Sequence, residues 1–561
     1  MLESFYLSNF KAFGQEPQHV KVKPITLIFG PNSSGKSSII HSLLLLNEVH
    51  KQSLKNIEDL NFDIHYTQKG GSSVDLGGFA QYIFKGENRR KFSFTFELKD
   101  KQLEDVYALI NPEPQKSLFG DSKPLFRSDS IIKIQLTAAA ENLDDQDKLT
   151  TKSFTTLESI DIQADGLKFI KISRKTASEF AIDWINPSNP IFESIAARYA
   201  RDENTINNFN QNDHSAFNRL INFIDVEFDS ILPSSLSIDF SNITKKDYLL
   251  EIRIVEGISE LLKAFSIHYK REIQKIEYLG PLRSYPTRSI DSSQDNDPNW
   301  ISGGGFAWRV VKENNLVRDK INVWLTNEEK IQVPYELDVQ FLHTIDAIEN
   351  DYSEFVESVL GAYFNSEAGL HNEELDAGEV FDELQQFLST NIRNNEAKYS
   401  SHKELIIKDK LTGTKVSHRD IGIGISQVLP VLVNAFGNKN KTIAIEQPEI
   451  HLHPKLQSSI IEVFLDSVKE NNNRFILETH SEHLIKALQI EVAKYTKSNG
   501  KNGISPHDVS ILYVSKNGSE TEGAYIKEME LDDNGSFINP WPDDFFESSS
   551  KLTLERFEKL S

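Results

Sequence analysis

Residues 24–46 read PITLIFGPNSSGKSSIIHSLLLL, and this stretch decides the fold class of the chain. The apolar run over 25–29 predicts a buried strand, and the apolar-rich stretch over 38–46 predicts a helix. Between them, residues 30–37 fit the pattern G-x-x-x-x-G-K-[ST], in which backbone N–H groups and a helix N-terminus surround phosphate oxygens. Because strand, loop and helix follow in the required order, the stretch predicts a binding site for a nucleoside triphosphate.

The side chains of this loop have distinct expected roles. The Lys36 ammonium would reach the β- and γ-phosphates, and the Ser37 hydroxyl would bind Mg²⁺. The residues that we expect to contact the nucleotide here are Asn32, Ser33, Ser34, Gly35, Lys36, Ser37 and Ser38.

The composition excludes several classes of protein. With 561 residues, the chain has room for roughly three to four domain-sized units or one domain with large insertions. It contains no cysteine, which excludes disulfides, thiolate metal sites and cysteine nucleophiles and favours a reducing compartment. No apolar run approaches the roughly 18 residues that span a bilayer, and the N-terminus lacks a signal-peptide pattern. We therefore expect a cytoplasmic protein with no membrane contact.

The net charge of −22 arises from 61 basic and 83 acidic residues. A chain this acidic does not attract nucleic acid through its overall field, so contact with DNA would need a local basic patch or a partner subunit. Candidate patches lie at residues 89–91, 168–175 and 270–271, and each is first expected to be ordinary solvated surface.

A second motif, KTIAIEQPEIHLHPKLQ, occupies residues 441–457. It predicts a short strand that ends at Glu446, whose carboxylate could approach Mg²⁺ through water. Gln447 stands where a general base often sits, and its neutral amide cannot accept a proton. Loss of a positioned base typically costs about 10²–10⁴ in rate. Gln447 could still orient water, or Glu449 could act as the base, so we expect slow hydrolysis.

Two further motifs surround this one. The segment DIGIGISQVLP, residues 420–430, places Gly424 and Ser426 before an apolar helix, whose N-terminus can offer N–H groups to a phosphate. The segment FILETHS, residues 475–481, predicts a buried strand followed by His480, a candidate sensor of the γ-phosphate.

Taken together, these motifs resemble the ABC-type ATPases of the SMC/RecF-like branch. The segments that carry the resemblance are LSNFKAFG (7–14), GPNSSGKSS (30–38), GIGISQVLP (422–430), IEQPEIHLHP (445–454) and ETHSEHL (478–484). The resemblance implies an α/β P-loop NTPase of the ABC-ATPase head type, with large α/β or helical insertions and with ATP and Mg²⁺ as cofactors. In that family two heads enclose two ATP molecules, and the signature of one head caps the γ-phosphate held by the other.

The resemblance also assigns roles to individual residues. It places Ser37 and Glu446 at the metal, Gly424 and Ser426 at the nucleotide of a partner subunit, and His480 at the γ-phosphate. The other residues that it brings near the site are Lys11 and Phe13 in the early loop, Gln68 or Gln81 as a sensor of Mg²⁺, and His451 and His453 at the dimer interface.

The same comparison predicts how the chain is organised. The expected parts are an N-terminal part of the head (1–99), an insertion domain (100–275), a return to the head (276–339), a helical insertion or lid (340–400) and a C-terminal part of the head (401–561).

A narrower resemblance is to stand-alone ATPases of bacterial anti-phage defence, such as the PtuA subunits of Septu-type and retron-associated systems. It rests on residues 74–84, 276–288 and 539–546. It implies a homodimer or higher homo-oligomer that acts as a sensor or regulatory scaffold for a separate nuclease, of the HNH type. The sequence shows no nuclease site of its own. A DNA-repair or chromosome-maintenance ATPase and a non-hydrolysing nucleotide switch remain alternatives.

Two arginines of the 276–288 segment have open roles. Arg283 and Arg288 could contact phosphate or nucleic acid, or could form structural ion pairs.

Overall fold

The computed structural model describes most of the chain in two compact units. Unit 1 comprises residues 1–284, 293–305 and 430–561, and unit 2 comprises 285–292 and 306–429. The structure describes residues 2–52, 60–99, 101–110, 125–144, 146–150, 153–176, 179–199, 215–241, 248–283, 297–327, 333–343, 400–416, 423–516 and 523–540, with isolated positions between 353 and 386.

Unit 1 contains a six-stranded sheet that is parallel except at one edge. Its order is β11 (Ile276–Leu279), β15 (Thr442–Glu446), β16 (Arg474–Glu478), β3 (Ile25–Phe29), β17 (Val509–Lys516) and β18 (Ala524–Glu528), with β18 antiparallel. Every residue of β3 and of β15 is buried, as expected of parallel strands that are covered on both faces. The strands predicted over residues 25–29, up to Glu446 and before His480 are therefore confirmed.

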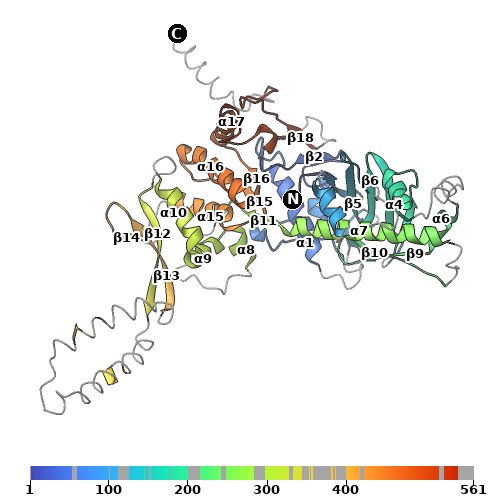
Figure 1. The fold of residues 1–561 in the computed structure, drawn as a ribbon, viewed down its shortest axis with the longest axis horizontal. Coiled ribbons are helices and arrows are strands. Elements are labelled where there is room, and N and C mark those ends of the chain that lie inside the picture. The colour runs from blue at the N-terminus through green and yellow to red at the C-terminus, as the bar shows by residue number, and fades with distance from the viewer. Residues whose placement is uncertain are drawn as a thin grey trace, which may run out of the picture. The chain divides into compact units, whose positions relative to one another are not determined.

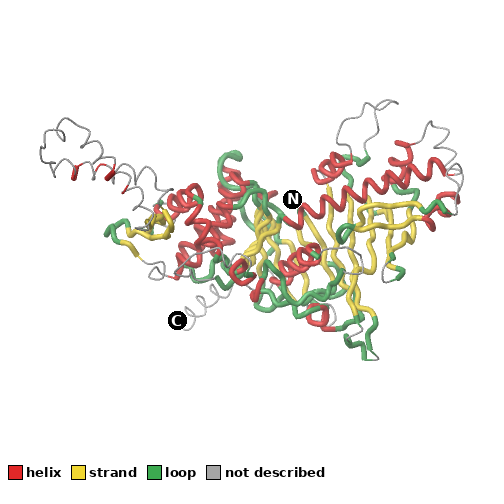
Figure 2. The backbone as a smooth tube through the Cα atoms, turned by 90° about the horizontal axis from the view of Figure 1, so that it is seen from below, coloured by secondary structure: helices red, strands yellow, loops and turns green. Residues whose placement is uncertain are grey.

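The second sheet of unit 1 is antiparallel. Its order is β2 (Gln18–Lys21), β1 (Ser4–Ser8), β4 (Phe92–Lys99), β5 (Ile131–Glu141), β6 (Phe154–Ala164), β7 (Leu167–Arg174) and β8 (Phe180–Ile185). Figure 2 shows these strands side by side, with helices over one side. The segment expected as an insertion from residue 100 thus extends the sheet that β1 and β4 begin; its boundaries as a domain stay a prediction.

One long helix covers this antiparallel sheet. Helix α7 (Leu249–Gln274) runs along it (Figure 1). Tyr269 of this helix packs on Phe96 of β4, with ring centroids 5.1 Å apart. The other elements of unit 1 are α1 (Lys36–Lys51), α2 (Phe79–Tyr82), α3 (Lys101–Ile110), α4 (Pro190–Tyr199), α6 (Ser215–Leu220), β9 (Ile224–Phe228), β10 (Pro233–Ile238), α8 (Pro298–Ser302), α16 (Pro454–Asn471) and α17 (Glu482–Lys497).

Unit 2 is smaller and mixed. A three-stranded antiparallel sheet of β12 (Tyr335–His343), β13 (Ser400–Asp409) and β14 (Lys415–Val416) packs with α9 (Phe306–Glu313) and α10 (Asn315–Thr326). Helix α15 (Ile423–Gly437) begins in unit 2 and ends in unit 1. The predicted apolar helix is therefore present, but its predicted start is wrong, because Gly424 and Ser426 lie in its first turn and not before it.

Several predicted features lie outside the described residues. They are most of the acidic stretch over 340–400, residues 420–422 of the signature segment, Arg288, and the end of the terminal segment over 541–546. Among the described helices, none has both the length and the hydropathy of a membrane span.

Candidate functional site

The loop over residues 30–37 follows β3 directly and leads into α1, in the order that the sequence predicts. Two of its positions require glycine. Gly30 has φ +150° and Gly35 has φ +108°. A Cβ at Gly30 would lie 2.1 Å from the carbonyl oxygen of Val514, and one at Gly35 would lie 2.6 Å from the Ala12 Cβ. The loop is therefore held between β17 and the early loop at residues 9–13, and it has no room for a side chain at positions 30 and 35.

Lys36 begins α1 and its ammonium folds back onto the loop. The Nζ atom donates to the carbonyl oxygen of Pro31 at 2.8 Å and to that of Gly30 at 3.2 Å. Burial lowers the pKa of Lys36, and the nearby Glu478 carboxylate opposes that shift. A phosphate in the loop would thus meet a partly desolvated cation, which attracts it more strongly than a hydrated one.

The acidic end of β16 lies closest to this loop. Glu478 pairs in register with Ile28 of β3 on one side and with Glu446 of β15 on the other. A hydrogen bond from the Ser37 hydroxyl reaches the Glu478 carboxylate. Burial, and then the like charge of Glu446, raise the pKa of Glu478 to about 7. The carboxyl edge of the parallel sheet thus places Glu478 beside the Ser37 hydroxyl, with Glu446 on the next strand.

Glu446 is fixed by a chain of hydrogen bonds that the sequence did not reveal. Its Oε1 accepts from the Tyr278 hydroxyl at 3.0 Å and contacts His41 Nε2 at 3.2 Å, while His41 Nδ1 lies 2.7 Å from Lys11 Nζ. Since an ammonium only donates, Nδ1 is the acceptor and Nε2–H donates to Glu446. Burial lowers the pKa of His41. A neutral imidazole therefore connects the early loop to Glu446.

Gln447 lies in a left-handed turn just after β15. Its φ is +47°, and its backbone N–H donates to the Glu478 carbonyl at 2.8 Å. The Arg283 Nη2 donates to the carbonyls of Gln447 at 2.9 Å and of Glu446 at 3.3 Å. Burial lowers the pKa of Arg283 to about 10, opposed by Glu449. In this structure Arg283 supports the turn, which favours the structural reading of this residue.

Glu449 and His480 join the two strand ends. The buried Glu449 accepts the backbone N–H of His480 on Oε1 at 2.9 Å, whereas its Oε2 has no hydrogen-bond partner. Burial raises the pKa of Glu449. Burial, and then the charge of Lys36, lower the pKa of His480, so a neutral imidazole follows β16.

The remaining predicted site residues have different environments. Asn32 and Ser33 are exposed, Ser34 and Ser38 are buried, and the Ser34 Oγ has no partner. Phe13 is fully buried in the core of unit 1, where it packs behind Gly35.

The predicted signature and magnesium-sensing residues lie elsewhere. Ser426 is buried and Gly424 half-buried in the part of α15 that belongs to unit 2. Gln68 is exposed and accepts from Lys51, and Gln81 is exposed beside Gly77. Their roles stay predictions.

His41, Tyr278 and Glu478 are site residues that were not predicted from the sequence. A signal existed for Glu478, because it ends a strand that is parallel to the strand of Glu446 and so shares its edge of the sheet. No sequence signal marks Tyr278 or His41, whose contacts with Glu446 depend on the packing of β11 and α1.

In two of the predicted basic patches, each cationic side chain contacts an acidic or an aromatic neighbour. In the patch over 89–91, Arg89 pairs with Asp147, Arg90 with Glu87 and Lys91 with Glu158. In the patch over 168–175, Lys171 pairs with Asp161 and Lys175 with Asp183, while Lys168 lies over the Trp184 ring and Arg174 over that of Phe154. These patches are therefore unlike an open phosphate-binding surface.

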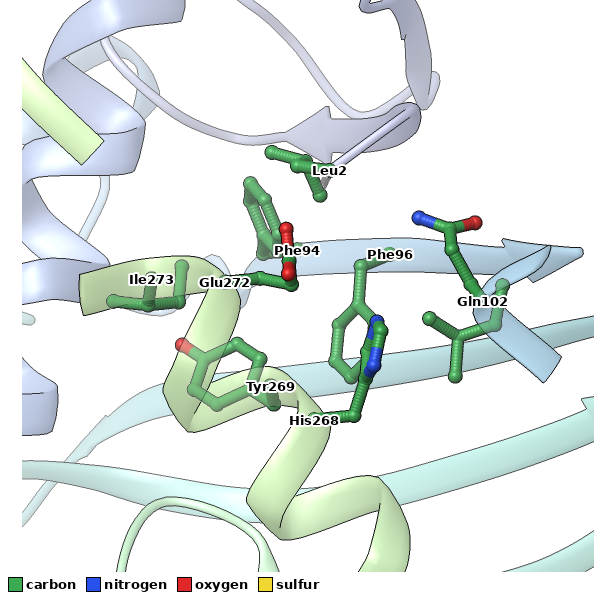
Figure 3. A pocket seen from close by; sticks show the side chains of 9 residues that line it. Leu2, Phe94, Phe96, Gln102, His268, Tyr269, Glu272 and Ile273 are labelled. Carbon is green, nitrogen blue, oxygen red and sulfur yellow. The ribbon is translucent and has the colours of Figure 1, made fainter. Parts of the chain in front are cut away.

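A small cavity lies between β4 and α7, apart from all the predicted site residues (Figure 3). Its lining is mainly hydrophobic, with Phe94 and Phe96 opposite His268 and Tyr269. Burial lowers the pKa of His268 and so favours a neutral imidazole there. The cavity has none of the features of a phosphate site.

One family model covers the strands that end at Glu446 and Glu478. Residues 309–485 match the family model of the AAA ATPase domain. This range contains β15, β16 and the residues from Glu446 to His480, whereas the phosphate loop lies before it. Residues 504–555 match a family described as a protein of unknown function (DUF3696). No curated protein matches the sequence.

Among solved structures, three SMC heads align over nearly the whole chain. A head bound to the C-terminal winged-helix domain of ScpA covers 95% of this chain and 98% of its own, at 11% identity and TM-score 0.33. One from Pyrococcus furiosus, with an extended coiled coil and bound to the C-terminal domain of ScpA, covers 99% and 98% at 11% identity and TM-score 0.31. One from Thermotoga maritima covers 94% and 99% at 10% identity and TM-score 0.30. At TM-scores this low, the likeness does not bear on function.

The geometry and the family match agree on the class of protein. The chain is a mixed α/β P-loop NTPase with an ATPase domain, in which Lys36 and Ser37 face the acidic ends of β15 and β16. This confirms the predicted fold class and the expectation of an ATP-binding ATPase.

The raised pKa of Glu478 predicts a stability that depends on pH. Between the usual glutamate pKa and about 7 the folded protein binds the extra proton, so the free energy of unfolding should fall as pH rises through that window. In nucleotide-free protein in EDTA, Glu478→Gln should therefore raise stability at pH 8 by at most about 3 kcal/mol and change it little at pH 5. Thermal unfolding at both pH values measures this. An equal change in stability at both pH values would contradict this prediction. The control is Glu97→Gln, because Glu97 is also a buried glutamate that is hydrogen-bonded to a serine, Ser4.

Proposed function

We propose that this chain binds ATP with Mg²⁺ at residues 30–38 and turns it over slowly, acting as an ATP-held switch. The observation that carries the proposal is the neutral Gln447 at the strand end where a catalytic base is expected, beside a complete phosphate loop. The turn at Gln447 is held by Arg283 and by the Glu478 carbonyl. The backbone at the position of the base is therefore ordered, but the Gln447 amide cannot accept a proton from water. A long-lived ATP-bound state suits a switch that is held in one state by ATP, which we call a latch, better than an ATPase that works through repeated cycles of hydrolysis.

Individual residues take defined roles in this proposal. Lys36 would bind the phosphates, and Ser37 with Glu446 would hold Mg²⁺, Glu446 through water. The residues present fit such a group, because the Ser37 hydroxyl lies beside the buried Glu478 carboxylate, and Glu446 lies in register with Glu478 on the next strand. The metal, when bound, would neutralise charge on the phosphate oxygens. The neutral His480 would contact the γ-phosphate.

We further propose that two copies assemble around ATP, with Gly424 and Ser426 of each acting at the nucleotide of the other. Support comes from the family pattern of the signature segment. The test measures ATP turnover and mass in solution together, by light scattering in Mg²⁺–ATP and in ADP. We expect a dimer or larger assembly in ATP and turnover below about 0.1 s⁻¹. A monomer in both nucleotides, or turnover near the common enzyme value of about 10 s⁻¹, would overturn the latch.

At the level of the cell, we propose a sensor or regulatory scaffold for a separate nuclease, of the HNH type, in anti-phage defence. The support is the resemblance over residues 74–84 and 276–288. Within the second segment, Tyr278 and Arg283 contact Glu446 and Gln447, so the residues that carry the resemblance adjoin the ATP site. A nuclease that co-purifies with this chain and whose activity depends on Mg²⁺–ATP would support the proposal.

The second candidate is a DNA-repair or chromosome-maintenance ATPase, and turnover stimulated by DNA ends would favour it. The ion-paired patches over 89–91 and 168–175 count against direct DNA binding there. A non-hydrolysing switch is the limiting case of the first proposal.

A further inference from the structure

Two glutamates end neighbouring strands at the site, and they have different surroundings. Glu478 is on β16, directly beside β3, whereas Glu446 is on β15, one strand further from the phosphate loop. The residue after Glu478 donates its backbone N–H to the Ile28 carbonyl at 2.9 Å, which fixes the end of β16 against the last residues of β3 before the loop. The Ser37 hydroxyl hydrogen-bonds to Glu478.

The two carboxylates also differ in their hydrogen bonds. Glu446 Oε1 already receives the Tyr278 hydroxyl and contacts His41, which fixes that carboxylate within the protein. Glu478 is 5% exposed, and its Oε2 has no hydrogen-bond partner. The buried Ser34 Oγ of the loop is also unpartnered. A buried carboxylate oxygen without a donor is costly unless a ligand satisfies it.

We propose that Glu478 is a direct ligand of the Mg²⁺ that accompanies the nucleotide, together with the Ser37 hydroxyl. Glu446, held by Tyr278 and His41, then acts from the outer shell, through water. The inference rests on the proposed ATP binding and adds a ligand to that site.

The chemistry of the donors fits this cation. Among the described residues, no group of three or more His, Cys, Asp or Glu side chains is arranged to hold a metal alone. Mg²⁺ is usually bound by one or two carboxylates together with substrate phosphates and water, so a lone inner carboxylate beside a hydroxyl is sufficient. A divalent cation there would also neutralise the repulsion between Glu478 and Glu446, which now lie in register on adjacent strands.

The experiment compares the affinity for a fluorescent ATP analogue in Mg²⁺ with that in EDTA, using the full chain. In the wild type we expect tighter binding in Mg²⁺. In Glu478→Gln the gain from Mg²⁺ should fall by at least about 10- to 100-fold, which is the loss typical for removal of a residue that only orients a metal ligand. Affinity in EDTA should stay equal or improve, because a negative charge beside the phosphates is gone. Glu97→Gln should keep the wild-type ratio, since this glutamate is also buried and bonded to a serine, Ser4.

The outcomes separate this inference from the proposed function. If Glu478→Gln keeps the wild-type gain from Mg²⁺, Glu478 is not a ligand although ATP binding stands. If the wild type binds the analogue in neither condition, ATP binding itself fails and the inference falls with it. Should Glu478→Gln not fold, Glu478→Asp keeps the charge but shortens the reach. A reduced gain in affinity from Mg²⁺ in that variant would support Glu478 as a direct ligand, and an unchanged gain would overturn that assignment.

Discussion

Replacing Gln447 by glutamate should raise the ATP turnover of this chain by about 10²-fold or more, because the substitution supplies the missing base. The backbone at this position is already ordered by the Arg283 guanidinium and the Glu478 carbonyl. The new carboxylate would join Glu446, Glu449 and Glu478, whose charges would raise its pKa and so make it a stronger base near pH 7. Single-turnover and steady-state measurements on matched preparations give the change in rate.

The matched control is Gln447→Leu, which removes the amide without adding a base. It should leave turnover at or below the wild-type rate. If the wild type already turns over briskly and Gln447→Glu changes little, the base is elsewhere. Glu449 is then the choice, because its buried Oε2 has no partner and burial raises its pKa. Glu449→Gln would abolish turnover in that case.

Replacing Lys36 by methionine should weaken nucleotide binding by about 10²-fold and abolish turnover. Lys36 is 4% exposed, so the bonds of its ammonium to the phosphates would form where water competes little. Charge-assisted hydrogen bonds of this kind are worth about 1.5–3 kcal/mol each, and methionine keeps most of the side-chain volume. Affinity for a fluorescent ATP analogue measures the loss.

Lys51→Met is the control for this variant. Lys51 ends the same helix, α1, and contacts Glu48 and Gln68 at the surface. It should bind the analogue like the wild type. Wild-type affinity in Lys36→Met would show that the loop over 30–37 is not the nucleotide site.

The pattern of residues 24–46 was enough to predict a strand, a phosphate loop and a helix, and the structure has β3, the loop and α1 there. Such a motif is local in sequence, because strand, turn and helix are determined by neighbouring residues. The strands ending at Glu446 and Glu478 were likewise visible as short apolar runs bounded by polar residues. From these segments alone, the α/β P-loop class and the candidate catalytic residues Glu446, Gln447 and His480 could be predicted.

What the sequence could not reveal is which distant residues meet at the site. The order β11-β15-β16-β3 brings Tyr278 to Glu446, and the packing of α1 brings His41 and Lys11 to the same carboxylate. Glu478 became a candidate magnesium ligand only when its register with Ile28 placed it beside Ser37. The sequence thus determined the local elements and their chemistry. Only the tertiary structure decided which carboxylate lies next to the loop, because strand order depends on burial across the whole sheet and not on adjacent residues.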